Sequence, residues 1–487
     1  MRKIWLLTVA GLALTAAACG GDDDDTTAPT DAPAATTAAP ADTAAPDEGS
    51  TDTTAAPDNT SDDGTAPDTT APAAGGVSFD EVGRLLPAEC QGDNVADEDS
   101  GVTEDTVNVS VLSIDFEPLA SIGFAASNFD PTAAFETFVA AVNDAGGVCG
   151  RTIDVQRVLY DILQGQAGQA CVEATEDRAN LIVSISTYDQ PRCITDTGLP
   201  ALTGVDITEA DMAATNGLLF TRFPSLDDQM RATVLAAHES GHLDGTVGVW
   251  YGSILAGYSD AVEASALPLL DELGVDYTAF RTDASGPNDP AGQAALQAAA
   301  TDFASRGVDT VLSLVANTNW TGMITELHAQ GLDPQFLSVP QAGNTVNELF
   351  AERFGTGAIA PTQQFATFTY GNTEIGEDDP IAAACNALYT ELTGTVMEPF
   401  TFDYTSVTNS CVTVDSLVAA MSLAGGELNR ASIVEALDAL PPFRQPPLLG
   451  EVDWSADDRF GPDVWSVHDY DAATNTVATR EATFSVD

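Results

Sequence analysis

The chain has 487 residues, with 74 acidic and 16 basic side chains, and its formal net charge is −58 at pH 7. Such an excess of negative charge repels nucleic acid, and the sequence contains no basic patch that would bind it. The only lysine is Lys3, so the rest of the chain has none for a Schiff base, an amine nucleophile or a phosphate-binding loop.

Residues 1–19 have the pattern of a bacterial export signal. Arg2 and Lys3 precede an apolar stretch from Ile4 to Ala18 that is too short to span a bilayer comfortably. This stretch ends in three alanines before Cys19, which resembles a lipobox with Cys19 as the acylated mature N-terminus. A lipid there would hold the protein on the extracellular or periplasmic face of the cell membrane. An ordinary secretory signal with a chance cysteine is the alternative.

Residues 20–76 are composed mainly of Asp, Thr, Ala, Pro and Gly, with 13 acidic residues and no basic or aromatic ones. This composition buries too little apolar surface to offset backbone entropy, so it predicts a disordered linker. A flexible coil of this length reaches about 40 Å. A glycosylated stalk is an alternative for the Thr/Pro-rich composition. Residues 77–104 form a lead-in segment at the start of the folded head, which comprises residues 77–487. This head is too long for a single hydrophobic core, so we expect it to form two lobes.

Seven cysteines are present, and setting aside Cys19 leaves six. An even number in an exported chain favours three disulfides. Other pairings and buried free thiols remain alternatives, and no spacing forms a C-x-x-C zinc or redox motif. The preferred pairs are Cys171–Cys193, Cys385–Cys411 and, by elimination, Cys90–Cys149.

The head alternates strand and helix patterns. Val107, Val109 and Val111 alternate with polar residues, which predicts a strand that Leu112 and Ile114 extend. Further strands are expected at 152–159, 181–185, 201–203, 246–250, 310–315 and 335–339. Helices are expected from Asp130-Pro131 to Gly146 and at 167–177, 228–240, 256–273, 290–306 and 322–330. This alternation predicts parallel sheets covered on both faces, which bind ligands beyond the carboxyl ends of their strands.

Several segments follow one another in a recognisable order over most of residues 105–360. They are TVNVSVLS, DPTAAFETFVAAVNDAGGVCGRTIDV, ACVEATEDRANLIVSIS, GLPALTG, GTVGVWYG, GVDTVLSLV and GLDPQFLSVPQAGN. Their order resembles the type I periplasmic binding proteins, and most closely the Leu/Ile/Val-binding family of ABC transporter substrate-binding lipoproteins. Later in the chain, NSCVTVDSLVAAMSLAGG resembles the late helix of lobe one.

The resemblance implies an α/β fold of two doubly wound parallel-sheet lobes joined by a three-crossing hinge. Lobe one would comprise residues 105–226 and 362–447, and lobe two residues 227–361 and 448–487. Ligand contacts to both lobes would stabilise the closed state.

The implied function is non-enzymatic and needs no cofactor: a monomeric head captures a small polar or amphipathic molecule for the permease and ATPase subunits of an ABC importer. Branched-chain amino acid-like compounds, amides and related organic solutes are the expected ligands. A ligand-sensing surface receptor of the same fold is the alternative.

The resemblance also marks candidate ligand contacts. In the family, the loop after the third strand holds the ligand carboxylate with hydroxyl and backbone N–H groups, and here that loop contains Ser186, Thr187 and Tyr188. Two departures argue against a standard amino-acid ligand: Asp206 would repel a carboxylate, and Gln341 stands where relatives use a glutamate for the ligand ammonium. The remaining candidates are Asp115, Phe116, Val205, Tyr251, Leu255, Tyr258, Asn317 and Thr318.

One local motif competes with this interpretation. His238, Glu239 and His242 form H-E-x-x-H, the spacing that places two imidazoles on one helical face to bind zinc. Glu263 is a candidate third ligand for a zinc metalloprotease. Against it, Gly241 weakens a helix interior and the next predicted strand begins soon afterwards, so this is a remote alternative.

Overall fold

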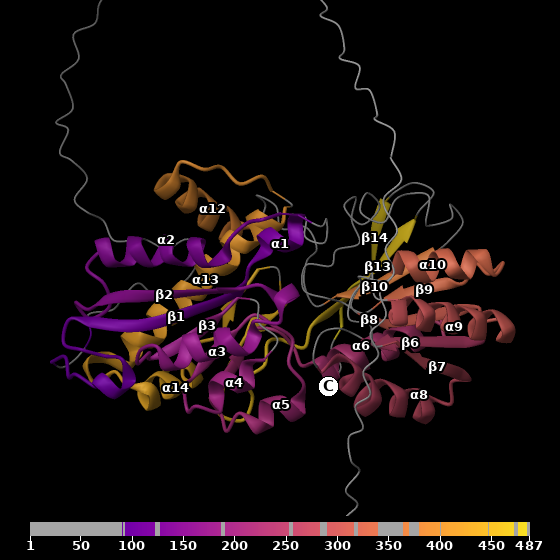
Figure 1. Cartoon of the computed structure of the whole chain (residues 1–487), viewed down its shortest axis with the longest axis horizontal. Coiled ribbons are helices and arrows are strands. Elements are labelled where there is room, and N and C mark those ends of the chain that lie inside the picture. The colour runs from indigo at the N-terminus through magenta and orange to yellow at the C-terminus, as the bar shows by residue number, and fades with distance from the viewer. Residues whose placement is uncertain are drawn as a thin grey trace, which may run out of the picture. The chain divides into compact units, whose positions relative to one another are not determined.

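The computed structural model describes residues 90, 93–121, 127–186, 190–252, 257–282, 290–315, 320–338, 364–369, 379–399, 401–446, 448–471 and 476–484. The export signal with Cys19 and the linker therefore lie outside the described residues. Within them, two β-sheets each carry helices on both faces (Figure 1). We call the five-stranded sheet with its helices lobe one, and the seven-stranded sheet with its helices lobe two.

The sheet of lobe one is entirely parallel, in the order β2-β1-β3-β4-β5. Val109 of the central strand β1 pairs with Val155 on one side and Ile182 on the other. The four strands expected in this lobe are confirmed, whereas the short strand β5 was not expected. The strands are β1 (Thr106–Ile114), β2 (Thr152–Tyr160), β3 (Ile182–Ile185), β4 (Ala201–Thr203) and β5 (Leu219–Thr221).

Alternate side chains of β1 enter two different cores. Val109 and Val111 pack with Phe138 of α2 and with α13, whereas Leu112 packs with Cys171 of α3 on the opposite face. This follows from the period of two along a strand, and it buries both faces of the sheet. The helices of lobe one are α1 (Phe116–Ser121), α2 (Pro131–Asp144), α3 (Ala167–Glu176), α4 (Pro191–Thr195), α5 (Glu209–Ala214), α12 (Pro380–Thr393), α13 (Phe402–Ala424) and α14 (Arg430–Asp438). Short 3-10 turns lie at Glu98–Ser100, Ile162–Gln164 and Gly425–Glu427.

Helix α13 forms much of the core of lobe one. Its region Phe402–Glu427 is long and apolar enough to cross a membrane, yet 78% of its most apolar window is buried inside the fold. It packs along α2, and Ser410 donates a hydrogen bond to the carbonyl of Pro131 at 3.1 Å. Its apolar composition therefore reflects its position as a central core helix.

The sheet of lobe two has the order β14-β13-β10-β9-β8-β6-β7. Its strands are β6 (Val247–Gly252), β7 (Tyr277–Arg281), β8 (Thr310–Val315), β9 (Gln335–Ser338), β10 (Gln364–Thr369), β13 (Trp465–Asp471) and β14 (Thr476–Phe484). The strands from β6 to β10 are parallel, whereas β13 and β14 add an antiparallel edge that the sequence pattern did not predict. Antiparallel edge strands on a mainly parallel sheet are common in α/β folds.

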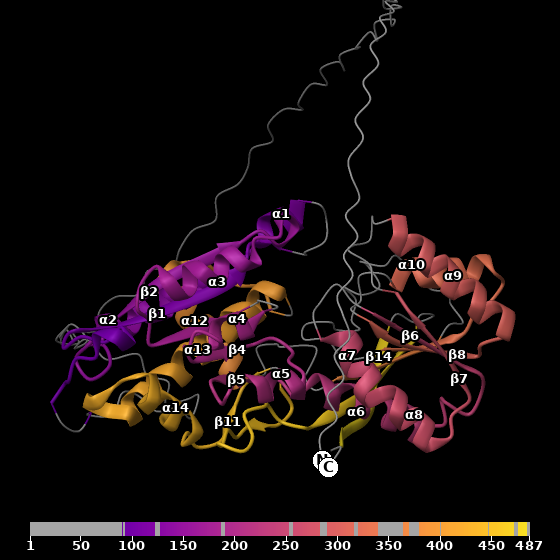
Figure 2. The same cartoon turned by 60° about the horizontal axis from the view of Figure 1, so that its bottom comes forward.

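Two helix layers cover the sheet of lobe two (Figure 2). One layer contains α6 (Leu226–Glu239) and a continuous helix made of α7 (Tyr258–Ala261), a π-helical turn (Val262–Ala266) and α8 (Leu267–Leu273). The other contains α9 (Pro290–Arg306) and α10 (Trp320–Ala329). Within β6, Val249 faces the first layer and Trp250 faces the second, so this sheet also has a core on each side.

Two segments belong to a different lobe from the one expected from the sequence. Residues 364–369 were expected in lobe one, with no strand predicted there, but they form β10, which pairs with β9 in lobe two. The short hairpin of β11 (Phe443–Arg444) and β12 (Glu451–Val452) is followed by Trp454, which was expected in lobe two. Instead, the Trp454 ring packs against Phe220 and Phe443 of lobe one, with ring centroids 5.4 and 5.2 Å apart.

Two chain crossings between the lobes lie side by side. Residues 222–225 lead from β5 into α6, and residues 453–464 lead from the hairpin to β13. The Thr221 N–H donates to the Arg459 carbonyl at 3.0 Å, and the Gly461 N–H donates to the Phe223 carbonyl at 2.8 Å. A Cβ at residue 461 would lie 1.9 Å from a backbone oxygen of the other crossing, so only glycine allows this approach.

All three preferred disulfides are confirmed. Cys90–Cys149, Cys171–Cys193 and Cys385–Cys411 have Cα atoms 5.2, 6.2 and 5.8 Å apart, and all of them join elements of lobe one. The first disulfide fixes the start of the described head. Beside it, the fully buried Arg151 donates to the carbonyls of Thr103, Val95 and Gly426, and burial lowers the pKa of its guanidinium.

Candidate functional site

The carboxyl ends of the parallel strands carry most of the candidate ligand contacts that the structure describes. In lobe one, Asp115 follows β1, Ser186 follows β3, and Val205 and Asp206 follow β4. In lobe two, Tyr251 lies at the end of β6. Because parallel strands end at one edge of their sheet, each lobe gathers its candidates at the edge where such sheets generally bind ligands, called the ligand-binding edge below.

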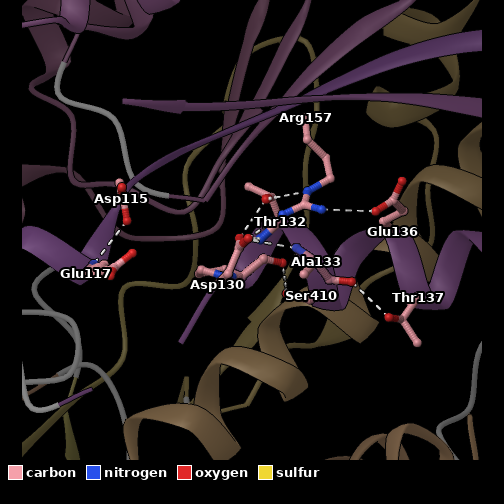
Figure 3. Close-up of polar contacts among 10 residues, drawn as sticks. Asp115, Glu117, Asp130, Thr132, Ala133, Glu136, Thr137, Arg157 and Ser410 are labelled. Atoms are coloured by element: carbon pink, nitrogen blue, oxygen red, sulfur yellow. Dashed lines mark hydrogen bonds and ion pairs between the residues drawn. The ribbon is translucent and has the colours of Figure 1, made fainter. Parts of the chain in front are cut away.

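Asp115 and Phe116 form the turn from β1 into α1. The Asp115 N–H donates to the Tyr160 carbonyl at 2.8 Å, and its carboxylate accepts the Glu117 N–H at 3.0 Å (Figure 3). The half-buried Phe116 ring lies 5.1 Å from the ring of Phe402 at the start of α13. Asp115 therefore organises the turn, while Phe116 and Phe402 give lobe one an aromatic pair.

A charged cluster nearby has no net positive charge left to attract an anion. Asp130 caps α2 by accepting the N–H groups of Thr132 and Ala133. Arg157 of β2 forms ion pairs with Asp130 and with Glu136, the latter at 3.3 Å (Figure 3). Because two carboxylates share one guanidinium, this cluster stabilises the helix start and does not provide an anion site.

Ser186 and Val205 occupy neighbouring strand ends in lobe one. The Ser186 N–H donates to the Leu112 carbonyl at 2.9 Å, and its side chain is half-buried. The Val205 N–H donates to the Thr203 hydroxyl at 3.1 Å, and its carbonyl accepts the Thr221 hydroxyl at 3.2 Å. Both backbones are thus fixed by β-sheet neighbours, while their side chains remain partly accessible.

The carboxylate of Asp206 accepts two hydrogen bonds from lobe two. Its Oδ1 accepts from Gln229 Nε2 of α6 at 2.8 Å, and its Oδ2 accepts from the Tyr258 hydroxyl of α7 at 2.9 Å. Tyr258 is only 2% exposed and Gln229 is fully buried. Both carboxylate oxygens are therefore engaged by protein donors. The sequence had indicated Asp206 and Tyr258 as separate ligand contacts, and the structure brings them into contact with each other.

Tyr251 belongs to a polar group at the edge of lobe two. Its hydroxyl donates to Glu263 Oε1 at 3.2 Å, and Arg281 Nη1 donates to the same oxygen at 2.8 Å. Glu263 lies in the π-helical turn, a local irregularity that is frequent at functional sites. Glu263, considered above as a third zinc ligand, thus pairs with an arginine and a tyrosine.

The H-E-x-x-H motif lacks the helical context that zinc binding requires. Helix α6 ends at Glu239, Ser240 is its C-cap, and Gly241 adopts a left-handed conformation with φ of 74°. His242 therefore lies beyond the helix, so the two imidazoles do not share one helical face. Among the described residues, no group of three or more His, Cys, Asp or Glu side chains could hold a metal ion.

The remaining candidate contacts lie outside the described residues. They are Thr187, Tyr188, Leu255, Asn317, Thr318 and Gln341.

Two residues that the sequence analysis missed belong to this region. Gln229 lies on the buried stripe of α6 with Leu226 and Met230, and a polar residue on such a stripe is a detectable signal. Phe402 is far from Phe116 in sequence and only the tertiary fold brings them together, so no local pattern marks it.

Two lobes with candidate residues at the carboxyl ends of parallel strands define a solute-binding architecture. Residues 121–473 match the protein family described as Periplasmic binding protein, and this match covers most of the chain. The chain therefore belongs to the periplasmic binding protein family, which confirms the family and the type I fold inferred from the sequence. No curated protein matches the chain by sequence.

Several solved structures have the same fold. A fatty acid ABC transporter substrate-binding protein from Thermomonospora curvata is similar with a TM-score of 0.57 and 15% identity, over 80% of this chain and 94% of that one. A branched-chain amino acid ABC transporter protein from Thermus thermophilus, with bound valine, gives 0.57 and 14%, over 78% and 97%. A leucine-binding protein from Thermotoga maritima gives 0.57 and 15%, over 78% and 99%.

Proposed function

We propose that this protein is a lipid-anchored solute-binding protein that captures a small polar or amphipathic molecule between its two lobes and delivers it to an ABC importer. The observation that carries the proposal is the family match over a chain whose two parallel sheets place candidate contacts at their carboxyl ends. The ABC transporter proteins of the same fold support the delivery step.

The described residues favour a ligand with an apolar part. Phe116 and Phe402 form an aromatic pair beside the ligand-binding edge of lobe one, and Val205 is half-buried at the same edge. The partly accessible Ser186 can hydrogen-bond a polar head group. Branched-chain amino acid-like compounds, amides and related organic solutes combine both features, and fatty acids extend the series because one neighbour in fold is named for them.

The net charge of the chain limits how an anionic ligand would be held. Among the arginines with described side chains, those at 157, 178, 192, 231, 281, 306, 444 and 459 are each ion-paired to a carboxylate. The other three, Arg151, Arg222 and Arg430, donate hydrogen bonds to carbonyl, hydroxyl or amide oxygens of the protein. A ligand carboxylate would therefore be bound by hydroxyl and backbone N–H groups, as the family resemblance implies for the loop that begins at Ser186.

A thermal-shift screen of the full-length Cys19→Ser variant tests the proposal. The library should contain L-leucine, L-valine, their amides, short organic acids, aromatic acids and a fatty acid. A true ligand at 100 times its dissociation constant stabilises the folded state by about 2.7 kcal/mol. An absence of any shift across the whole library would contradict the small-solute function.

The membrane anchor is tested separately. Metabolic labelling with a fatty acid should label the wild-type protein, and the Cys19→Ser variant should lose the label and appear in the soluble fraction. Labelled Cys19→Ser protein, or unlabelled wild-type protein that remains soluble, would contradict the anchor while leaving solute binding untouched.

A further inference from the structure

Two carboxylates form a junction between the lobes next to the first chain crossing. Asp206 of lobe one accepts hydrogen bonds from Gln229 and Tyr258 of lobe two. In the reverse direction, Asp227 of α6 in lobe two accepts the Glu209 N–H of lobe one at 2.8 Å. The other oxygen of Asp227 accepts the Ser265 hydroxyl of the π-helical turn at 2.8 Å. Each lobe thus contributes one carboxylate that accepts a hydrogen bond from the other lobe.

The backbone of the same region is fitted closely. The Leu226 N–H donates to the Ile207 carbonyl at 2.9 Å, which joins the start of α6 to the loop after β4. Gly257, just before α7, has φ of 84°, and a Cβ there would lie 3.0 Å from the Thr208 methyl group. The junction therefore links the loop after β4 to α6 and α7 through backbone packing as well as side-chain hydrogen bonds.

Because these hydrogen bonds are buried, their loss should cost more folding free energy than the loss of exposed ones. Asp227 is 8% exposed, Tyr258 is 2% exposed and Gln229 is fully buried. A hydrogen bond to a charged acceptor contributes more than a neutral one, and its loss leaves a buried polar group without its partner.

We propose that Asp206 and Asp227 are positioning residues that couple the two lobes, and that the Asp206–Tyr258 hydrogen bond is the element through which movement of α7 is transmitted to the loop after β4. Asp206 then acts as part of the hinge and Tyr258 orients the start of α7 beside the ligand-binding edge. This assignment rests on the proposed two-lobed binding function. It also explains how an acidic residue is tolerated where relatives hold a ligand carboxylate: its charge is already engaged by Tyr258 and Gln229.

Hydrogen exchange of the ligand-free Cys19→Ser protein tests the coupling. Tyr258→Phe keeps the ring and removes only the hydroxyl, so the variant should stay folded. We expect exchange of the amides at 205–209 and 226–230 to become about tenfold faster, as for the loss of one charge-assisted hydrogen bond. Asp206→Asn should give a similar effect, and the double variant should be little worse than either single one, because both changes remove the same interaction.

A matched pair within lobe two provides the control. The Tyr277 hydroxyl donates to Asp271 at 3.1 Å, and neither residue contributes to the junction. Tyr277→Phe and Asp271→Asn should leave exchange at 205–209 unchanged. Small-angle scattering should detect a changed radius of gyration in ligand-free Tyr258→Phe but not in Tyr277→Phe, a readout that a purely local role would not move.

Three results would overturn the coupling: unchanged exchange at 205–209 in Tyr258→Phe, fully additive effects in the double variant, or an unchanged radius of gyration. None of these measurements uses a ligand. If no solute shifts the melting temperature but Tyr258→Phe and Asp206→Asn speed exchange non-additively, the proposed function is rejected and the junction is retained. If a solute binds but exchange is unchanged in these variants, only the junction is rejected.

Discussion

The two lobes share an α/β plan but are held together differently. Lobe one contains all three disulfides and the buried Arg151, which fixes three separate backbone segments. The described part of lobe two contains no disulfide and depends on two apolar clusters, centred on residues such as Val249 and Phe303. Because disulfides act mainly on the unfolded chain while core packing acts on the folded one, the lobes should respond to different perturbations.

Reduction should have the largest effect and should be confined to lobe one. The disulfides close loops with sequence separations of 59, 22 and 26 residues. Each such cross-link contributes about 3–4 kcal/mol by the chain-entropy estimate. We therefore expect calorimetry with a reductant to show a low-temperature transition for lobe one that separates from the transition of lobe two. Mass spectrometry of alkylated cysteines should confirm which disulfides opened. A single transition that keeps its midpoint on full reduction would contradict the difference between the lobes.

Truncating a core side chain of lobe two should destabilise lobe two and leave lobe one unchanged. Phe303 of α9 is fully buried in lobe two, where it packs with Trp250 and Phe336. Phe303→Ala should destabilise lobe two by about 3–5 kcal/mol, because it removes apolar contacts and leaves a cavity. Denaturant unfolding under reducing conditions, in which the two transitions separate, should show a shift of the lobe-two transition alone. An equal shift of both transitions would indicate that the lobes unfold as one unit.

Salt should act on both lobes alike. With a formal charge of −58 and few basic residues, the chain repels itself in both its lobes. Raising NaCl from low ionic strength should screen this repulsion and raise both melting temperatures by a few degrees. Sucrose at equal osmolality serves as the control for general exclusion effects. A falling melting temperature with added NaCl would show that surface ion pairs outweigh the repulsion.

The smallest effect is expected at the junction itself. Partial burial raises the pKa of Glu209 above the ordinary 4.5, and the nearby Asp227 and Asp228 raise it further, with Arg231 opposing. The folded state then binds this proton more tightly than the unfolded state, so stability falls as the pH rises from 4.5 towards the folded pKa. Glu209→Gln should remove that loss and stabilise the protein slightly at pH 7, within about 0.5 kcal/mol, because most of the side-chain surface is exposed and solvent screens its charge.

Unfolding measured at two pH values tests whether Glu209 lowers stability as the pH rises. Below pH 4 the variant and the parent should be equally stable, since the carboxyl group is then protonated in both states. A larger benefit at low pH than at pH 7 would contradict the proposed direction of the shift.

The sequence predicted most of the parallel strands and the longer helices before α12, because each of these elements is regular over its own length, but it did not predict the parallel strands β5, β7 and β10. The valine alternation of β1 and the cap at Asp130-Pro131 are local signals, and both elements formed where expected. The edge strands β13 and β14 and the position of Trp454 were not predicted, since pairing partners distant in sequence decide them.

In the candidate site, too, local features were predicted and contacts between distant segments were not. The family resemblance located the strand ends in advance, including Ser186 and Tyr251. It did not reveal that Asp206 would contact Tyr258 and Gln229, because that contact depends on how α6 and α7 meet the loop after β4. Phe402 likewise joins Phe116 only through the packing of α13 against lobe one.

Titration calorimetry of the best compound from the thermal-shift screen tests the central claim most directly. The Cys19→Ser protein should bind one molecule per chain, and Phe116→Ala should weaken binding, by about tenfold if the ring loses an apolar contact worth about 1.4 kcal/mol. Phe138→Ala, a truncation of a buried ring of α2 in lobe one, should lower stability without this loss of affinity. Binding with no defined stoichiometry, or equal affinity in Phe116→Ala and the parent, would contradict a solute site at the ligand-binding edge of lobe one.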